Sequence, residues 1–299
     1  MDDLLPLLRA HYPLRFDSLE FVRESVSVAY IASAGNEKYF LRCVKPIAAA
    51  QARQGVDIQV FLQSRGFPVP PVILTNEGAP CFEADKHLYI LYEYIEGAEV
   101  NPAQDAKALG ALVGQLHRVM RDYPGPLIKH DRHYYIDKYI DILRAMQYPR
   151  ADEFAAYGDA LWEKVKGLPR GYCHGDMYSG NFLKAPDGRI YVLDFDTSGE
   201  GFPMVDPALI CNRTDYFKFQ KAGREKSRWV FGRFLPEYLK HSPLSKIEID
   251  ALYDLIAVYH FALQATIIEL HGPDCVDNKF LDNQLDWLRR WQRQCERRR

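Results

Sequence analysis

Residues 171–196 read GYCHGDMYSGNFLKAPDGRIYVLDFD, and they predict a short β-hairpin with polar residues gathered at its open end. The Ala-Pro-Asp-Gly sequence at 185–188 is a strong turn signal between two β-prone stretches. When the chain is folded about this turn, Asn181 comes opposite Asp194 and the leucine before it. Side chains that face each other across such a pair have Cβ atoms roughly 5 Å apart. One carboxamide and one or two carboxylates are therefore expected to converge, with Asp176 in the loop just before them.

This group of oxygen-bearing side chains suits phosphoryl transfer. Such chemistry needs an Asp to orient the attacking hydroxyl and accept its proton, and an Asn and an Asp to hold Mg²⁺, a cation that prefers oxygen ligands. The interval from Asp176 to Asn181 equals the Asp-to-Asn interval of the protein-kinase catalytic loop, and Asp194-Phe195 stands where the kinase D-F-G metal ligand stands. The alternative is a structural His-Gly-Asp turn in which the Asp only caps a helix, and the complete set of residues disfavours it.

Outward from this hairpin, the sequence is β-rich on its N-terminal side and helical on its C-terminal side. The expected elements before residue 101 are a helix ending near residue 13, strands within 19–44, a helix over 48–64, and strands at 72–75 and 88–92. Pro102 then occupies the first position of a helix, and most of the remaining chain has helical periodicity. We therefore expect an α+β fold with a small antiparallel-sheet N-terminal lobe, residues 1–96, and a larger helical C-terminal lobe, residues 97–299.

Composition and charge exclude several classes of protein. The formal net charge of −2 gives no electrostatic case for a nucleic-acid partner. The six cysteines are dispersed without a C-x-x-C pair, which suits a reducing cytoplasm. The longest apolar run, residues 255–268, is too short to span a membrane and is expected to be a buried helix. We expect a cytoplasmic protein without nucleic-acid or membrane partners, and the sequence carries no signal for an oligomeric state.

Several motifs together resemble the aminoglycoside phosphotransferase and choline kinase-like superfamily. The centre of the resemblance is His174-Gly175-Asp176 with Asn181, followed by Leu193-Asp194-Phe195-Asp196. Further similar segments lie at 66–70, 91–97, 109–117 and 206–209, so that the likeness runs from about residue 19 to residue 211. The resemblance implies a protein-kinase-like fold that uses ATP and Mg²⁺. It implies Asp176 as the catalytic base, Asn181 and Asp194 as metal ligands, Asp196 as a further ligand, and the backbone of Glu93 and Ile95 as the adenine contact.

The chain departs from the family pattern around the nucleotide. The family's strand lysine falls at Arg42, so the resemblance implies that Arg42 contacts the ATP phosphates. Because side chains alternate along a strand, only one of Arg42 and Lys45 can face the cleft, and Lys45 stands directly before Pro46, at the end of the strand. The glycine-rich nucleotide loop is replaced by a stretch in which Ser25 is the expected phosphate contact. The helix glutamate that should pair with the strand cation is not evident, since Gly55 stands near its expected place and Asp57 is the nearest acid.

The hypothesis from the sequence is transfer of the γ-phosphate of ATP to a hydroxyl of a small molecule, as in aminoglycoside phosphotransferases. Within that class the acceptor stays open between an antibiotic, choline or ethanolamine, homoserine and a thiosugar. A nucleotide-binding pseudokinase is the alternative from another class, favoured by Arg42 and opposed by the intact set of Asp176, Asn181 and Asp194. Asp206 is expected to hold the catalytic loop. The tyrosines at 134, 135 and 139 are expected to be core residues, with stacking on a substrate as the alternative.

Overall fold

The structure is a computed structural model that describes residues 4–296, and its chain divides into two compact units. Unit 1 comprises Met1–Val100, Asp122–Pro126 and Ser179–Ser198. Unit 2 comprises Asn101–Arg121, Leu127–Tyr178 and Gly199–Arg299. By its contacts, the segment with the predicted hairpin therefore belongs with the N-terminal part of the chain. The lobe boundary expected between residues 96 and 97 stays a prediction.

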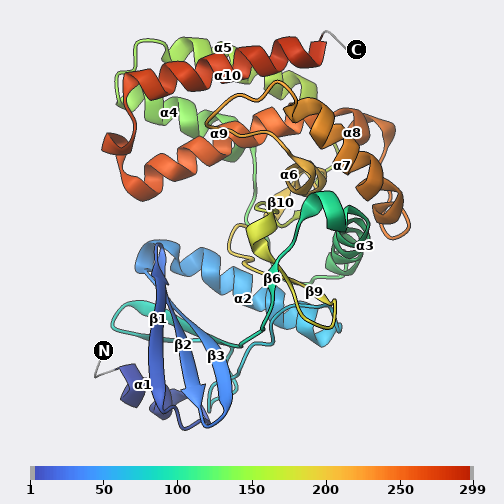
Figure 1. The fold of residues 1–299 in the computed structure, drawn as a ribbon. Helices are drawn as coiled ribbons and strands as arrows, with labels where there is room; N and C mark the ends of the chain where they lie inside the picture. The colour runs from blue at the N-terminus through green and yellow to red at the C-terminus, as the bar shows by residue number, and fades with distance from the viewer. Residues whose placement is uncertain (1–3, 297–299) are drawn as a thin grey trace. The chain divides into compact units, whose positions relative to one another are not determined.

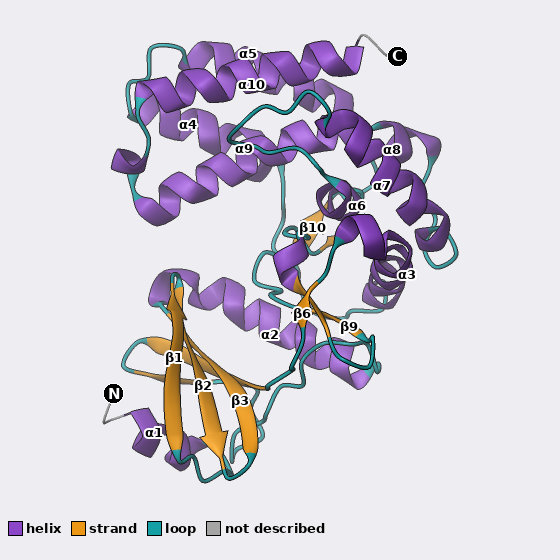
Figure 2. Ribbon diagram, viewed as in Figure 1, coloured by secondary structure: helices purple, strands orange, loops and turns teal. Residues whose placement is uncertain are grey.

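Unit 1 contains a five-stranded antiparallel sheet with the order β1-β2-β3-β5-β4. Its strands β1, β2 and β3 are labelled in Figure 2. Its strands are β1 (Ser18–Glu24), β2 (Ser27–Ala34), β3 (Glu37–Val44), β4 (Phe82–Ala84) and β5 (His87–Glu93). The strand expected at 72–75 is wrong, because Val72 forms only an isolated bridge with Tyr92. Two prolines precede Val72, and the chain turns at Thr75, which accepts a hydrogen bond from the amide of Gly78, so the pairing does not continue.

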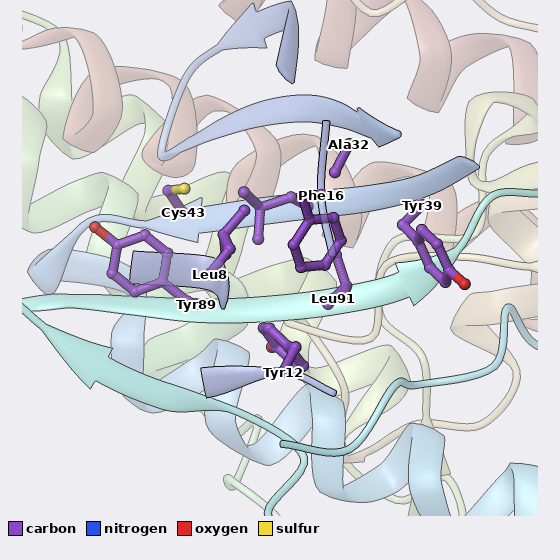
Figure 3. Close-up of a cluster of buried hydrophobic side chains, with 9 residues drawn as sticks. Leu8, Tyr12, Phe16, Ala32, Tyr39, Cys43, Tyr89 and Leu91 are labelled. Atoms are coloured by element: carbon purple, nitrogen blue, oxygen red, sulfur yellow. The ribbon is translucent and has the colours of Figure 1, made fainter. Parts of the chain in front are cut away.

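A helix packs on each face of this sheet. On one face, α1 (Leu4–His11) and the residues after it join a buried cluster with alternate residues of the strands, as Figure 3 shows: Leu8, Tyr12, Phe16, Ala32, Tyr39, Leu41, Cys43, Tyr89 and Leu91. On the other face, Val56 of α2 (Ala49–Ser64) packs with Val44 of β3 in a second cluster. A short 3₁₀ helix, Pro46–Ala48, leads into α2. Because side chains alternate along a strand, Arg42 of β3 lies on the face that α2 covers.

The predicted hairpin is present in unit 1. It is formed by β8 (Phe182–Lys184) and β9 (Ile190–Val192), with β6 (Ala98–Glu99) paired to β8 and a 3₁₀ turn, Ser179–Asn181, before it. Phe182 pairs with Val192, and the Leu193 amide donates to the Asn181 carbonyl at 2.9 Å. This register places Asn181 at the open end of the hairpin, as the sequence predicts.

Unit 2 is mostly helical (Figure 1). Its helices are α3 (Pro102–Met120), a π-helical turn (His133–Asp137), α4 (Lys138–Ala145), α5 (Ala151–Val165), α6 (Val205–Cys211), α7 (Gly223–Tyr238), α8 (Lys246–Asp250), α9 (Leu252–His271), a 3₁₀ turn (Pro273–Cys275) and α10 (Asn278–Glu296). A two-stranded antiparallel pair joins β7 (Gly171–Cys173) to β10 (Gly199–Gly201). Pro102 is the first residue of α3, as predicted, and α9 is the buried helix expected at 255–268. Over residues 4–296, no helix has the length and apolar character needed to cross a membrane.

Candidate functional site

A pocket of about 260 Å³ lies within unit 1, beside β3, the segment after β5 and the open end of the hairpin. Its lining includes most of the residues predicted to bind nucleotide or metal: Arg42, Glu93, Ile95, Asn181 and Asp194. Ser25, the predicted phosphate contact, is exposed in the turn between β1 and β2 and lies outside this lining. Arg23, near the end of β1, lines the pocket instead.

Arg42 is held in this pocket by carboxylates. Its guanidinium donates to both oxygens of Asp196, at 3.1 Å to Oδ1 and 2.6 Å to Oδ2, and lies 3.8 Å from Oδ1 of Asp194. Burial disfavours the charge of Arg42, but the two carboxylates outweigh it and hold the pKa of Arg42 well above its ordinary value. Lys45 instead pairs with Glu24 at 2.8 Å, with 36% of its side chain exposed. Arg42, rather than Lys45, therefore lines the pocket. That Arg42 contacts the ATP phosphates stays a prediction.

Asn181 and Asp194 present two oxygen-bearing side chains to the same pocket. Asn181 is buried, whereas the Asp194 side chain is 42% exposed. Asp194 has a φ of 57°, a left-handed conformation that is uncommon for a residue other than glycine and that is often retained at functional sites. A carboxylate and a carboxamide are a fitting donor set for Mg²⁺, which is usually bound through one or two carboxylates together with waters and phosphate oxygens.

The loop that carries Asp176 lies in unit 2 and is anchored by a buried carboxylate. Asp206 of α6 accepts hydrogen bonds from the backbone amides of His174, at 2.7 Å, and Gly175, at 2.9 Å. It also contacts Nε2 of His117 of α3 at 2.8 Å, and it is fully buried. Gly175 has a φ of 83°, which glycine adopts without steric cost. These contacts confirm the expectation that Asp206 holds the loop.

The carboxylate of Asp176 accepts a hydrogen bond from the hydroxyl of Tyr259, a residue of α9, at 2.7 Å. Burial and the nearby Asp176 carboxylate raise the pKa of Tyr259 well above its ordinary value, so the phenol keeps its proton and acts as the donor. Tyr259 is a residue of the site that the sequence patterns do not indicate. Its only signal there was a polar hydroxyl within a run expected to be buried, and nothing in that run indicates the partner.

The three tyrosines at 134, 135 and 139 have different environments. Tyr135 and Tyr139 are core residues, each only 1% exposed, as the sequence analysis expected. Tyr134 is half-buried and stacks on the ring of His130, with centroids 3.8 Å apart and an interplanar angle of 4°. Burial and nearby acids, Asp176 among them, raise the pKa of Tyr134, so its phenol is also neutral.

A sequence model of the phosphotransferase enzyme family (APH) matches residues 18–244. The chain belongs to this family. An uncharacterized protein of Deinococcus radiodurans is 25% identical to it, over 97% of this chain and 89% of that protein. The matched region contains Arg42, the hairpin and the loop of Asp176, so the family membership and the geometry above concern the same residues.

Solved structures of other proteins have a fold similar to that of this chain. The chain is similar to amicoumacin kinase hAmiN in complex with AMP-PNP, Ca²⁺ and Ami, with a TM-score of 0.77 and 17% identity over 99% of this chain and 93% of that one. A microcompartment-associated aminopropanol kinase gives 0.70 and 16%, over 99% and 97%. The choline kinase LicA from Streptococcus pneumoniae gives 0.62 and 18%, over 99% and 98%. The predicted kinase-like α+β fold is thereby confirmed.

Proposed function

We propose that this phosphotransferase moves the γ-phosphoryl group of ATP to a hydroxyl group of a small molecule, with Mg²⁺ as cofactor. The observation that carries the proposal is the pocket of unit 1, where Arg42, Asn181 and Asp194 line one space. The likeness to a kinase crystallised with AMP-PNP and Ca²⁺ supports nucleotide binding by the same fold. Phosphoryl transfer from a nucleotide uses a cationic side chain and oxygen ligands for a metal ion, and residues of both kinds line this pocket.

The roles in nucleotide binding follow from the pocket lining. The backbone of Glu93 and Ile95, at the end of β5 and just after it, binds the adenine edge. Arg42 contacts the phosphates, because a guanidinium forms paired hydrogen bonds with phosphate oxygens. Arg23 takes the phosphate-contacting role that was expected of Ser25, since Arg23 lines the pocket. Asn181 and Asp194 would hold Mg²⁺, which would neutralise charge on the phosphates during transfer.

Asp176 acts on the acceptor. Its carboxylate orients the acceptor hydroxyl and takes its proton as the hydroxyl oxygen forms a bond to the γ-phosphorus. The bond from that phosphorus to the oxygen bridging the β- and γ-phosphates breaks, and ADP leaves. Tyr259 fixes the orientation of the carboxylate by donating to one of its oxygens, and Asp206 fixes the backbone of the loop. The acceptor is proposed as a class, a small alcohol, which includes aminoglycosides, choline or ethanolamine, homoserine and thiosugars.

The proposal is tested first with Asp176→Asn. Because a general base contributes about 10²–10⁴-fold to rate, the variant should lose phosphate transfer to a panel of these alcohols while its affinity for ADP stays close to wild type. Asp187→Asn is the matched control, because Asp187 is exposed in the hairpin turn and accepts a hydrogen bond from the Arg189 amide in that turn. Near-wild-type turnover of Asp176→Asn would refute the assignment. If the wild-type protein binds nucleotide but transfers phosphate to none of these alcohols, the pseudokinase alternative is favoured.

The metal assignment has its own test. Asp194→Ala should weaken binding of Mg-ATP, and Asn181→Ala should raise the Mg²⁺ concentration needed for activity, because each removes one oxygen ligand. Without metal, both variants should bind the nucleotide with the affinity of the wild type. A crystal soaked with Mg-nucleotide that shows no ion within reach of either side chain would contradict the assignment.

A further inference from the structure

The acid that pairs with Arg42 comes from the segment after β9. Asp196 meets the guanidinium with both carboxylate oxygens, at 3.1 and 2.6 Å, which is the parallel two-bond geometry that fixes the plane of an arginine. The side chains of both partners are largely buried, at 12% and 16% exposure. Two hydrogen bonds leave other donors of the guanidinium to reach a phosphate, because arginine carries five N–H groups.

Helix α2 supplies space at this point and no acid. Gly55 lies on the buried face of α2, and a Cβ atom added there would lie 2.9 Å from Oδ1 of Asp196 and 3.0 Å from the backbone carbon of Phe195. Side chains essentially never approach that closely, so any residue other than glycine would displace Asp196. Asp57, the nearest acid of the helix, is exposed.

A second contact holds the same segment against α2. The side-chain amide of Gln54, next to Gly55, donates to the carbonyl oxygen of Ser198 at 2.7 Å. The chain from Asp196 to Ser198 is therefore held at the helix by contacts on either side of the carboxylate. Glycine within a helix costs about 1 kcal/mol relative to alanine, so its presence on the buried face of α2 needs a structural reason, and close approach of the Asp196 segment supplies one.

We propose that Asp196 is the positioning residue that holds Arg42 in the nucleotide pocket, in place of an acid on helix α2, and that Gly55 provides the room for it. This inference rests on the proposed function, because it concerns the cation that binds the phosphates. It reassigns Asp196, which the family resemblance implied as a further metal ligand. The Asp196 carboxylate would also keep Arg42 from pairing with Asp194, the proposed metal ligand, which lies only 3.8 Å from the guanidinium.

The test is ADP binding in EDTA, measured by calorimetry for wild type, Asp196→Asn, Arg42→Met and the double variant. If Asp196 acts through Arg42, Asp196→Asn should weaken metal-free ADP binding by about tenfold, because hydrogen bonds to a charged group are lost. In the Arg42→Met background the same substitution should cause no further loss. This combination would support the positioning role.

The alternative outcomes are distinct. A loss that appears only with Mg²⁺ would make Asp196 a metal ligand and overturn the inference while leaving the proposed function intact. Equal losses in both backgrounds, or no loss in either, would also overturn it. Wild-type protein that binds neither ADP nor Mg-ADP would refute the proposed function itself, and with it the inference.

A second variant perturbs Asp196 without removing a charge and keeps the test decisive if Asp196→Asn fails to fold. Gly55→Ala should weaken metal-free ADP binding and lower the melting temperature, although alanine is the better helix former. Gly232→Ala is the matched control, because Gly232 is an exposed glycine of α7 with open space around its Cβ position. It should leave ADP binding unchanged and keep or raise the melting temperature. Wild-type ADP affinity in Gly55→Ala would overturn the inference.

Discussion

Asp206→Asn tests how the catalytic loop is held, because it removes one charge and one acceptor from a fully buried carboxylate. In the wild type, Oδ2 accepts from the His174 amide at 2.7 Å and contacts His117 at 2.8 Å, and Oδ1 accepts from the Gly175 amide at 2.9 Å. A carboxamide has one oxygen. If the oxygen of the asparagine takes the place of Oδ2, the NH₂ group of the carboxamide takes the place of Oδ1. It then faces the N–H of Gly175, and two hydrogen-bond donors oppose each other.

The magnitude follows from these contacts. A hydrogen bond to a charged group contributes about 1.5–3 kcal/mol, and a buried donor left without a partner costs about 1–3 kcal/mol. Loss of one such bond and weakening of the other two should therefore lower the free energy of unfolding of unit 2 by about 3 kcal/mol. This is a large share of the roughly 5–15 kcal/mol that stabilises a folded domain. At about 2–4 °C per kcal/mol, the melting temperature should fall by about 6–12 °C.

The assay is thermal and urea unfolding followed by circular dichroism, with phosphate transfer measured well below the melting temperature. Turnover should fall as well, because the amides held by Asp206 belong to the two residues directly before Asp176. Asp277→Asn is the matched control in the same unit. Asp277 is exposed and accepts a hydrogen bond from the Phe280 amide at the start of α10. Asparagine caps a helix as well as aspartate does, so this substitution should leave the stability unchanged. If the two variants unfold with free energies within about 0.5 kcal/mol of each other, the anchoring role argued for Asp206 is wrong.

Three further predictions concern the two units. Arg42→Ala should raise the apparent KM for ATP strongly. Lys45→Ala should change this KM little, since Lys45 pairs with a glutamate outside the pocket lining. The reverse pattern in steady-state kinetics would contradict the strand orientation. Tyr259→Phe should lower kcat by about tenfold with the KM for ATP nearly unchanged, because it removes a hydrogen bond to the Asp176 carboxylate. Tyr216→Phe is the control, since it removes a hydroxyl that donates to a backbone carbonyl. Equal losses of kcat in the two variants would assign the effect to packing. Burial lowers the pKa of His260 to about 4, whereas histidine in an unfolded chain titrates near 6.5. Between these values the unfolded state binds protons more readily than the folded state. The stability of unit 2 should therefore fall as the pH falls from about 6.5 towards 4. His260→Gln should flatten this dependence in unfolding measurements made between pH 4 and 7, and an unchanged slope would assign it to other groups.

The local geometry of the site follows from short stretches of sequence. A strong turn signal sets the register of the hairpin, and the register places Asn181 opposite the residues around Asp194. The two-residue period of a strand predicts that only one of Arg42 and Lys45 faces the pocket, and Arg42 is the one that lines it. Pro102 marks the start of α3 because its ring suits the first turn of a helix. In each case the information lies in a few consecutive residues, because backbone conformation and side-chain period are local properties.

The pairing of groups that are distant in the chain depends on tertiary packing. Arg42 and Asp196 are 154 positions apart, and Tyr259 and Asp176 are 83 apart, so no local pattern connects them. Asp57 was the nearest acid on helix α2, yet the helix turns it outward and brings Gly55 against the Asp196 segment instead. Ser25 was expected at the phosphates, but the turn after β1 leaves it exposed and Arg23 lines the pocket. The physical reason is that the partner of a buried charge is set by how helices and sheets pack, which depends on contacts between segments far apart in the chain.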